Sequence, residues 1–139
     1  MSANKEIIDW IIKGDHDLGT AKLTYINIPE FIDTTAFHCQ QAVEKYLKSY
    51  LIYLSVPFRH SHDLIYLFEL ITPNDPDIEE YYDDLLELQG CAVELRYPNE
   101  TIFLSPEKVE KAISTAKCIR TFVTSKMSIS VDYNDIIDK

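Results

Sequence analysis

The sequence predicts an all-α protein, an up-and-down antiparallel helical bundle of four main helices plus one short helix. Only three glycines occur among 139 residues, and apolar residues recur at three- and four-residue steps over long segments. This combination favours helices over a turn-rich β fold. Short connections separate the segments, which predicts that neighbouring helices run antiparallel.

The first two helices are separated by a proline. The first is expected over residues 5–25, with a slip in its apolar periodicity near Gly14. Residues 15–17 are there predicted to be either a local loosening or an exposed turn. Pro29 closes the connector at a position that a first helical turn accepts. The second helix, the longest periodic run, is expected over residues 30–54.

Three further helices are expected over residues 62–71, 78–95 and 105–127. Ser61 is the predicted N-cap of the short one, because its hydroxyl can accept an orphan amide hydrogen. The segment "RYPN" ends the next, since a residue before proline is disfavoured in the α region. Ser105 is the predicted N-cap of the last.

The segments form one predicted domain over residues 1–127, followed by a tail over residues 128–139. The hydrophobic fraction is 46%, so the chain is expected to fold around one real core. The tail is predicted to be either frayed and flexible or docked on a partner.

The formal net charge of −10 limits the classes of partner. Such a surface repels nucleic-acid phosphates, so DNA is not an expected partner, although a local basic pocket remains allowed. Three widely spaced cysteines without a CxxC pair predict reduced thiols. The N-terminus lacks a signal-peptide pattern, and no apolar run approaches the roughly 20 residues of a membrane span. We expect a cytoplasmic protein without a membrane anchor.

A polar stripe runs along the second helix. His38, Gln41, Lys45 and Lys48 share a band roughly 80° wide when residues are placed at ~100° steps. Two ammonium groups, an imidazole and an amide could bind a phosphate or nucleotide. The alternative is a solvated face, with ion pairs to the acidic fourth helix. Gln40 lies close to the apolar side, where a buried amide must find hydrogen-bond partners.

Two other segments concentrate polar groups. The run "RHSHD", from Arg59 to Asp63, could in principle supply a two-His-plus-carboxylate metal site. It lacks a third partner at a spacing typical of metal sites, so no metal is predicted. Helix capping and loop hydrogen bonds are the simpler interpretation of these residues. Seven carboxylates lie between Asp75 and Glu87 without an intervening Lys or Arg. They indicate a solvated face, or a patch for a basic partner.

The segment "LRYPNE" places Arg96 and Tyr97 at a helix end. An arginine there can bond the last carbonyls, or it can use its planar fork to recognise phosphate. Tyr97 beside it could stack on a base. Glycine-rich phosphate loops, nucleophile elbows and zinc spacings are absent, and no cofactor is predicted.

Together these motifs resemble the HEPN domain family (higher eukaryotes and prokaryotes nucleotide-binding). The resemblance is carried by Trp10 and "DHDLGTA", then "FHCQQAVEKYLKSYL", "HSHDLIYL" and "LRYP", and extends from Trp10 to about Val123. It implies a small up-and-down bundle, usually a homodimer, similar to the helical domain of kanamycin nucleotidyltransferase. It also implies a partner, because members are often encoded beside a minimal nucleotidyltransferase that they bind.

Many HEPN proteins are toxins that cut RNA without metal, and the resemblance implies where their catalytic pair would lie. Their signature is an arginine followed by a histidine after four to six intervening residues. This chain has no histidine at those positions after Arg59, Arg96 or Arg120. The general acid or base is therefore missing from its usual place. His38 or His62 could substitute only if the fold brings it near Arg96.

Three functions remain open at this point. The first is a non-catalytic HEPN protein that binds a nucleotide, a nucleotidyltransferase partner as in toxin–antitoxin-like pairs, or both. Its candidate ligand residues are Arg96, Tyr97, Lys45, Lys48 and Gln41. The second is a diverged ribonuclease that uses Arg96 with His38 or His62. The third is a structural homodimeric scaffold.

Overall fold

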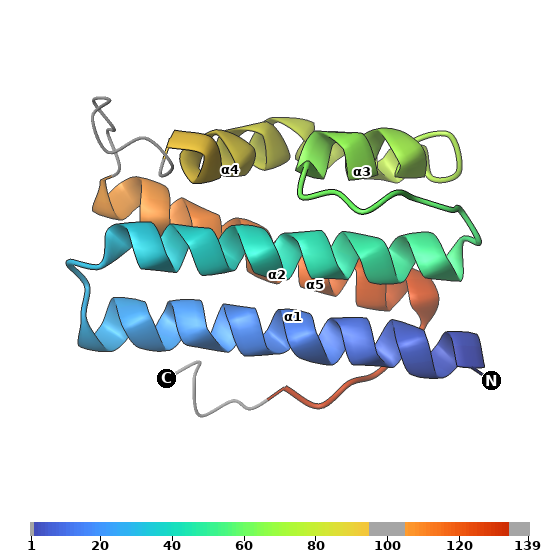
Figure 1. Ribbon diagram of the computed structural model, residues 1–139, viewed down its shortest axis with the longest axis horizontal. Coiled ribbons are helices and arrows are strands. Elements are labelled where there is room, and N and C mark those ends of the chain that lie inside the picture. The colour runs from blue at the N-terminus through green and yellow to red at the C-terminus, as the bar shows by residue number, and fades with distance from the viewer. Residues whose placement is uncertain (1, 95–104, 134–139) are drawn as a thin grey trace.

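The computed structural model describes residues 2–94 and 105–133, with side chains described for residues 4–91 and 105–133. Its elements are α1 (Ser2–Asn27), α2 (Ile32–Tyr53), α3 (Leu64–Ile71), the 3-10 helix η1 (Pro76–Tyr81), α4 (Tyr82–Glu94) and α5 (Pro106–Met127). Helices α1 and α2 lie side by side and antiparallel, α5 packs behind α2, and α3 and α4 form the upper layer (Figure 1). The predicted all-α bundle of four main helices and a short one is confirmed.

Helix α2 forms the centre of the bundle. Thirteen of its 22 residues are buried, which no other helix matches among the described residues. It contacts α1, α3, α4 and α5, so apolar side chains line more than one of its sides. The largest fully buried side chain is that of Tyr46, which faces α1. Burial of this kind is the main favourable contribution to folding of a small domain.

The irregular periodicity near Gly14 marks a close contact. Helix α1 continues without interruption through residues 13–17. A Cβ atom on Gly14 would lie 2.6 Å from Cε1 of Tyr46, so only glycine fits there. Asp15 is buried, and its carboxylate accepts a hydrogen bond from the Tyr46 hydroxyl at 2.7 Å. The predicted loosening or exposed turn is therefore wrong at Asp15.

Of the two N-caps predicted from the sequence, the structure confirms one and contradicts the other. Ser105 caps α5, where its hydroxyl accepts a hydrogen bond from the Lys108 amide. The prediction of Ser61 as a cap is wrong, because Asp63 caps α3 through the amides of Ile65 and Tyr66. The expected fourth helix also begins differently, since η1 precedes α4.

The segment after α5 runs back along the bundle beside α1 (Figure 1). Ile129, Val131 and Tyr133 alternate with exposed residues and pack against the core. Residues 134–139 lie outside the described part. Within the described part of the chain, no helix combines the length and apolarity that crossing a lipid bilayer requires.

Candidate functional site

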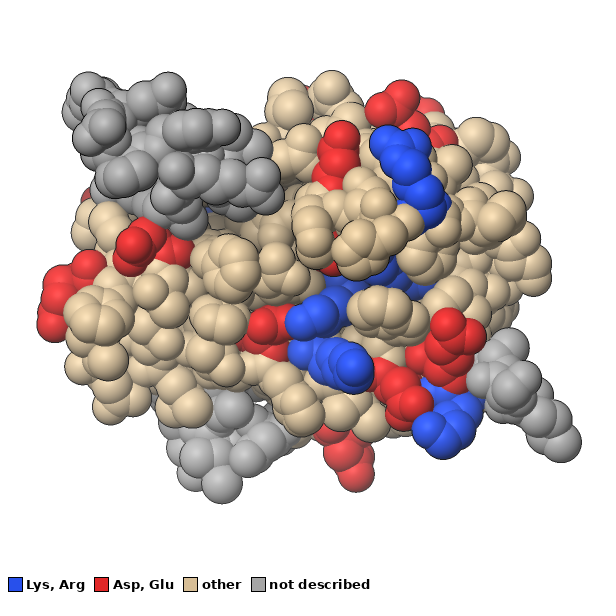
Figure 2. All heavy atoms as spheres, in the orientation of Figure 1, with Lys and Arg blue, Asp and Glu red and all other residues tan. Residues whose placement is uncertain are grey.

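The polar stripe of α2 divides into two clusters. We name them the Asp17 cluster (Asp17, His38 and Lys45) and the Glu44 cluster (Glu44, Lys48 and His62). Figure 2 shows Lys and Arg side chains gathered in the middle of the face that α1 and α2 form, with carboxylates beside them. The two clusters account for the polar side chains of α2 that sequence analysis selected, apart from Gln40 and Gln41.

In the Asp17 cluster, one carboxylate of α1 serves two groups of α2. His38 Nδ1 lies 2.8 Å from Asp17 Oδ1, and Lys45 Nζ donates to Asp17 Oδ2. The side chain of Lys45 is 24% exposed to solvent, and that of His38 is 26% exposed. An ammonium group carries three donors and Asp17 accepts from one, so Lys45 retains donors for a ligand oxygen. Gln41, one turn earlier on α2, is half-buried.

In the Glu44 cluster, a buried carboxylate serves two partners. Lys48 Nζ donates to Glu44 Oε2 at 2.8 Å, and only 4% of either side chain is exposed. The Lys48 ammonium also lies 5.5 Å from the centre of the Trp10 ring. A charge buried this deeply requires its partner, because an unpaired ion in the interior is strongly destabilising. Lys48 is therefore engaged inside the protein.

The loop between α2 and α3 completes the Glu44 cluster. Gln40 Nε2 donates to the His62 backbone carbonyl at 3.0 Å, which fixes this loop on α2. His62 Nδ1 lies 3.0 Å from Glu44 Oε1, while 52% of the His62 side chain is exposed. A neutral ring in this position holds its proton on Nδ1 and leaves Nε2 as an acceptor. An oriented imidazole of this kind can move a proton.

The structure corrects the interpretation of the stripe as one solvated face. Its ion pairs form with Asp17 of α1 and Glu44 of α2 itself, and not with the acidic fourth helix. Neither carboxylate is predicted as a site residue from the sequence. The spacing of Glu44 and Lys48 by four residues was a usable signal, because such pairs meet on a helix. Nothing local in the sequence indicates that Asp17 meets Lys45.

The other predicted site residues have separate outcomes. Arg96 and Tyr97 lie outside the described residues. In the "RHSHD" loop, the rings of His60 and His62 meet edge to face at 5.2 Å. The described residues include no group of three His, Cys, Asp or Glu side chains placed to hold a metal ion.

A partly buried ion pair joins Arg120 of α5 to Asp15 of α1. Arg120 of α5 donates to Asp15 through Nε at 2.6 Å and Nη2 at 2.9 Å, and Nη2 also donates to the Val131 carbonyl. The hydrogen bond to Asp15 raises the pKa of Arg120, although burial lowers it. Burial and Asp15 raise the pKa of Tyr46 as well. Arg120 therefore stays charged and Tyr46 stays neutral near neutral pH.

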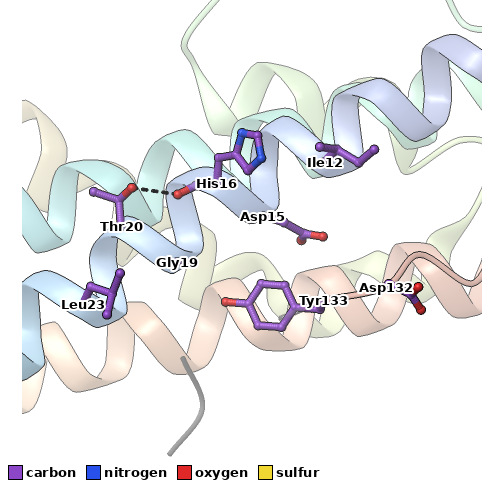
Figure 3. Close-up of a pocket in the computed structure, with 8 residues that line it drawn as sticks. All are labelled: Ile12, Asp15, His16, Gly19, Thr20, Leu23, Asp132 and Tyr133. Atoms are coloured by element: carbon purple, nitrogen blue, oxygen red, sulfur yellow. Dashed lines mark hydrogen bonds between the residues drawn. The ribbon is translucent and has the colours of Figure 1, made fainter. Parts of the chain in front are cut away.

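An open hollow of about 440 Å³ lies beside this ion pair, between α1 and the segment after α5. Figure 3 shows Asp15 pointing from α1 toward that segment, where Asp132 and Tyr133 form the opposite wall. Thr20 lines it too, but its hydroxyl donates to the His16 carbonyl of its own helix. Two carboxylates disfavour a phosphate ligand, so this hollow is a poorer nucleotide site than the Asp17 cluster.

Comparison with known proteins identifies a family for this chain. The HEPN domain family matches residues 7–127, which is most of the chain and spans α1 to the end of α5. No curated protein and no solved structure matches the chain. The matched region contains both polar clusters and the "LRYP" segment that follows α4. The chain therefore belongs to the HEPN domain family.

Proposed function

We propose that this HEPN protein is a non-catalytic binding protein, whose ligand is a minimal nucleotidyltransferase, a nucleotide, or both. The observation that carries the proposal is Lys45, a partly exposed ammonium whose only hydrogen bond among the described residues goes to Asp17. Its remaining donors suit a phosphate oxygen or a partner's carboxylate. Gln41 and His38 lie beside it on α2 and add an amide and an imidazole.

The two lysines of α2 have different parts in this proposal. Lys45 is the ligand-contacting group, because a quarter of its side chain remains exposed. Lys48 is buried in its ion pair with Glu44 and positions the helix and the loop of His62. Arg96 and Tyr97 remain proposed ligand residues outside the described part. We further propose that the protein is a cytoplasmic homodimer that acts in a toxin–antitoxin-like pair, as the HEPN resemblance implies.

The experiment compares Lys45→Ala with wild-type protein in two binding assays. One assay captures proteins from source-cell lysate on the tagged chain and identifies a nucleotidyltransferase by mass spectrometry. The other measures the rise in melting temperature with ATP, GTP, CTP and UTP. We expect wild-type protein to give a positive result in at least one assay, and Lys45→Ala to lose most of it.

The control is Lys5→Ala, which removes an exposed lysine of α1 that lies about three helical turns from Asp17. It should bind like wild-type protein. If Lys45→Ala and Arg96→Ala change the melting temperature and no binding property, the structural scaffold is the better description. If wild-type protein is positive in neither assay, the proposal is wrong.

A diverged ribonuclease is the second candidate, and the Glu44–His62 pair is the observation that favours it. Glu44 orients the His62 ring through its contact with Nδ1, and more than half of the His62 side chain is exposed to solvent. In this alternative His62 moves the proton and Arg96 stabilises phosphate charge. It predicts metal-independent RNA cleavage that is lost in both His62→Asn and Arg96→Ala. No cleavage by wild-type protein in EDTA would eliminate it.

A further inference from the structure

The outer face of α4 carries two neighbouring rows of side chains, each repeating every four residues. The apolar row is Tyr82, Leu86 and Gly90, and the acidic row is Asp83 and Glu87 of α4, preceded at the same spacing by Glu79 of η1. We name this surface the α4 face. Helix α4 lies in the upper layer of the molecule, with one side against the bundle and the other turned outward (Figure 1).

The apolar row is accessible and held in place. Tyr82 is 40% exposed and Leu86 is 47% exposed. The Tyr82 ring lies 5.3 Å from the ring of Phe68 on α3, which restricts its position. A Cβ atom on Gly90 would meet no heavy atom within 4 Å. Two exposed large side chains followed by a glycine in open space allow another helix to approach closely.

The acidic row has no direct ion-pair partner within the described part of the chain, although Glu87 interacts electrostatically with Lys111. Neighbouring carboxylates do have such partners, since Asp84 pairs with Lys111 at 3.0 Å and Asp77 pairs with Lys126. No ion pair of this kind joins the three carboxylates of the acidic row to a described residue, and all three residues are exposed. Asp83 and Glu87 are four residues apart on α4, and like charges at this spacing repel each other and destabilise a helix. Cations from outside the chain would remove this repulsion.

We infer that the α4 face binds a basic amphipathic helix of a partner protein. Its apolar stripe would cover Tyr82 and Leu86, and Lys or Arg side chains beside the stripe would meet the acidic row. A second copy is a poorer occupant, because it would add another chain of net charge −10. The inference does not depend on ligand binding at the Asp17 cluster, which lies on other helices.

The test uses a fluorescein-labelled peptide of Leu, Lys and Ala, about 18 residues long, which forms a helix of ~27 Å. Leu lies on one side of this helix, with Lys along its flanks. Fluorescence anisotropy should show saturable binding to wild-type protein. The variant Glu79→Gln/Asp83→Asn/Glu87→Gln should bind at least about ten-fold more weakly, and so should Leu86→Ala.

Gly90→Leu separates docking from folding. A Cβ atom at this position meets no heavy atom of the protein within 4 Å, so the fold should persist. The leucine side chain would block the approach of another helix, and peptide binding should therefore fall. The matched charge control is Glu6→Gln/Glu30→Gln/Glu107→Gln, which removes three exposed carboxylates elsewhere. It should bind the peptide as wild-type protein does.

Four results would overturn the inference. The first two are that the peptide does not bind wild-type protein saturably, and that a scrambled peptide binds as tightly as the designed one. The third is that the charge control weakens binding as much as the substitutions in the acidic row. The fourth is that wild-type protein is a dimer that Leu86→Lys converts to a monomer. The last would show that the α4 face joins two copies of this chain. None of these results bears on nucleotidyltransferase or nucleotide binding by Lys45, which the Lys45→Ala comparison tests separately.

Discussion

At the scale of single residues, Gly14 and Asp15 both fix the position of the Tyr46 side chain. Gly14 leaves room for the buried ring of Tyr46, and Asp15, its neighbour in sequence, accepts a hydrogen bond from the same tyrosine. One position thus supplies space and the next supplies a polar partner. A substitution at either position acts through Tyr46, whose side chain is fully buried.

Gly14→Ala should lower the free energy of unfolding by about 1–3 kcal/mol, because the added methyl group overpacks the contact with Tyr46. Gly90→Ala is the matched control. Its Cβ meets nothing within 4 Å, so the gain in helix propensity should raise stability by up to ~1 kcal/mol. Urea denaturation measures both. Equal effects of the two substitutions would refute the close contact at Gly14.

Asp75 should make stability depend on pH in the acid range. Burial alone would raise its pKa, but hydrogen bonds from Tyr50 and the Asp77 amide, with nearby Lys126, outweigh burial and lower the pKa below its ordinary 3.8. The folded state therefore binds this proton less readily than the unfolded state. The stabilisation is complete above that ordinary value and is lost as the pH falls through the folded pKa.

The measurement is a series of urea denaturations between about pH 5 and pH 2. Wild-type protein should lose stability more steeply than Asp75→Asn over this range. Lys126→Met should reduce the slope in part, since it removes one of the groups that lower the pKa of Asp75. Parallel curves for wild-type protein and Asp75→Asn would rule out this role for Asp75.

At the scale of the elements, helix starts are decided by which side chain reaches the free amides. Ser61 and Asp63 both precede α3 and both belong to preferred cap types. Asp63 reaches the amides of Ile65 and Tyr66, while the Ser61 hydroxyl accepts from the Asp63 amide outside the helix. Sequence preference alone does not distinguish the two, because the backbone conformation of the loop selects between them.

Asp63→Ala should therefore cost about 1 kcal/mol of stability, and Ser61→Ala clearly less. The Asp63 carboxylate also lies at the positive end of the α3 dipole, which adds to its effect. Thermal denaturation of the two variants at neutral pH makes the comparison. A larger loss for Ser61→Ala would mean that Ser61 is the cap.

At the scale of the whole molecule, Arg120 joins three parts of the chain. It donates to Asp15 of α1 and to the Val131 carbonyl, while its own helix α5 packs on α2. Arg120→Met leaves the buried Asp15 carboxylate without its cation and should cost about 3 kcal/mol or more. Combining it with Asp15→Asn should cost less than the sum of the two single changes. Additive costs in this double-mutant cycle would contradict the coupling.

The sequence predicts the helices well because their apolar periodicity is a local property. It predicts the pairing of side chains poorly, since pairs such as Asp17 with Lys45 depend on how two helices pack. Lys48 shows the difficulty: a helical wheel places it on the polar side, yet it is buried, paired with Glu44 and beside the Trp10 ring of α1. Glu44 was the partner within reach of sequence analysis, because it lies four residues earlier on the same helix.

The most direct test of the proposed function is capture from source-cell lysate on tagged wild-type protein and on Lys45→Ala, with and without nuclease treatment. Mass spectrometry identifies bound protein, and chromatography identifies bound nucleotide. We predict that wild-type protein retains a nucleotidyltransferase, a nucleotide or both after nuclease treatment, and that Lys45→Ala loses them while remaining folded. Retention of neither ligand by wild-type protein, or equal retention by both proteins, would contradict the proposal.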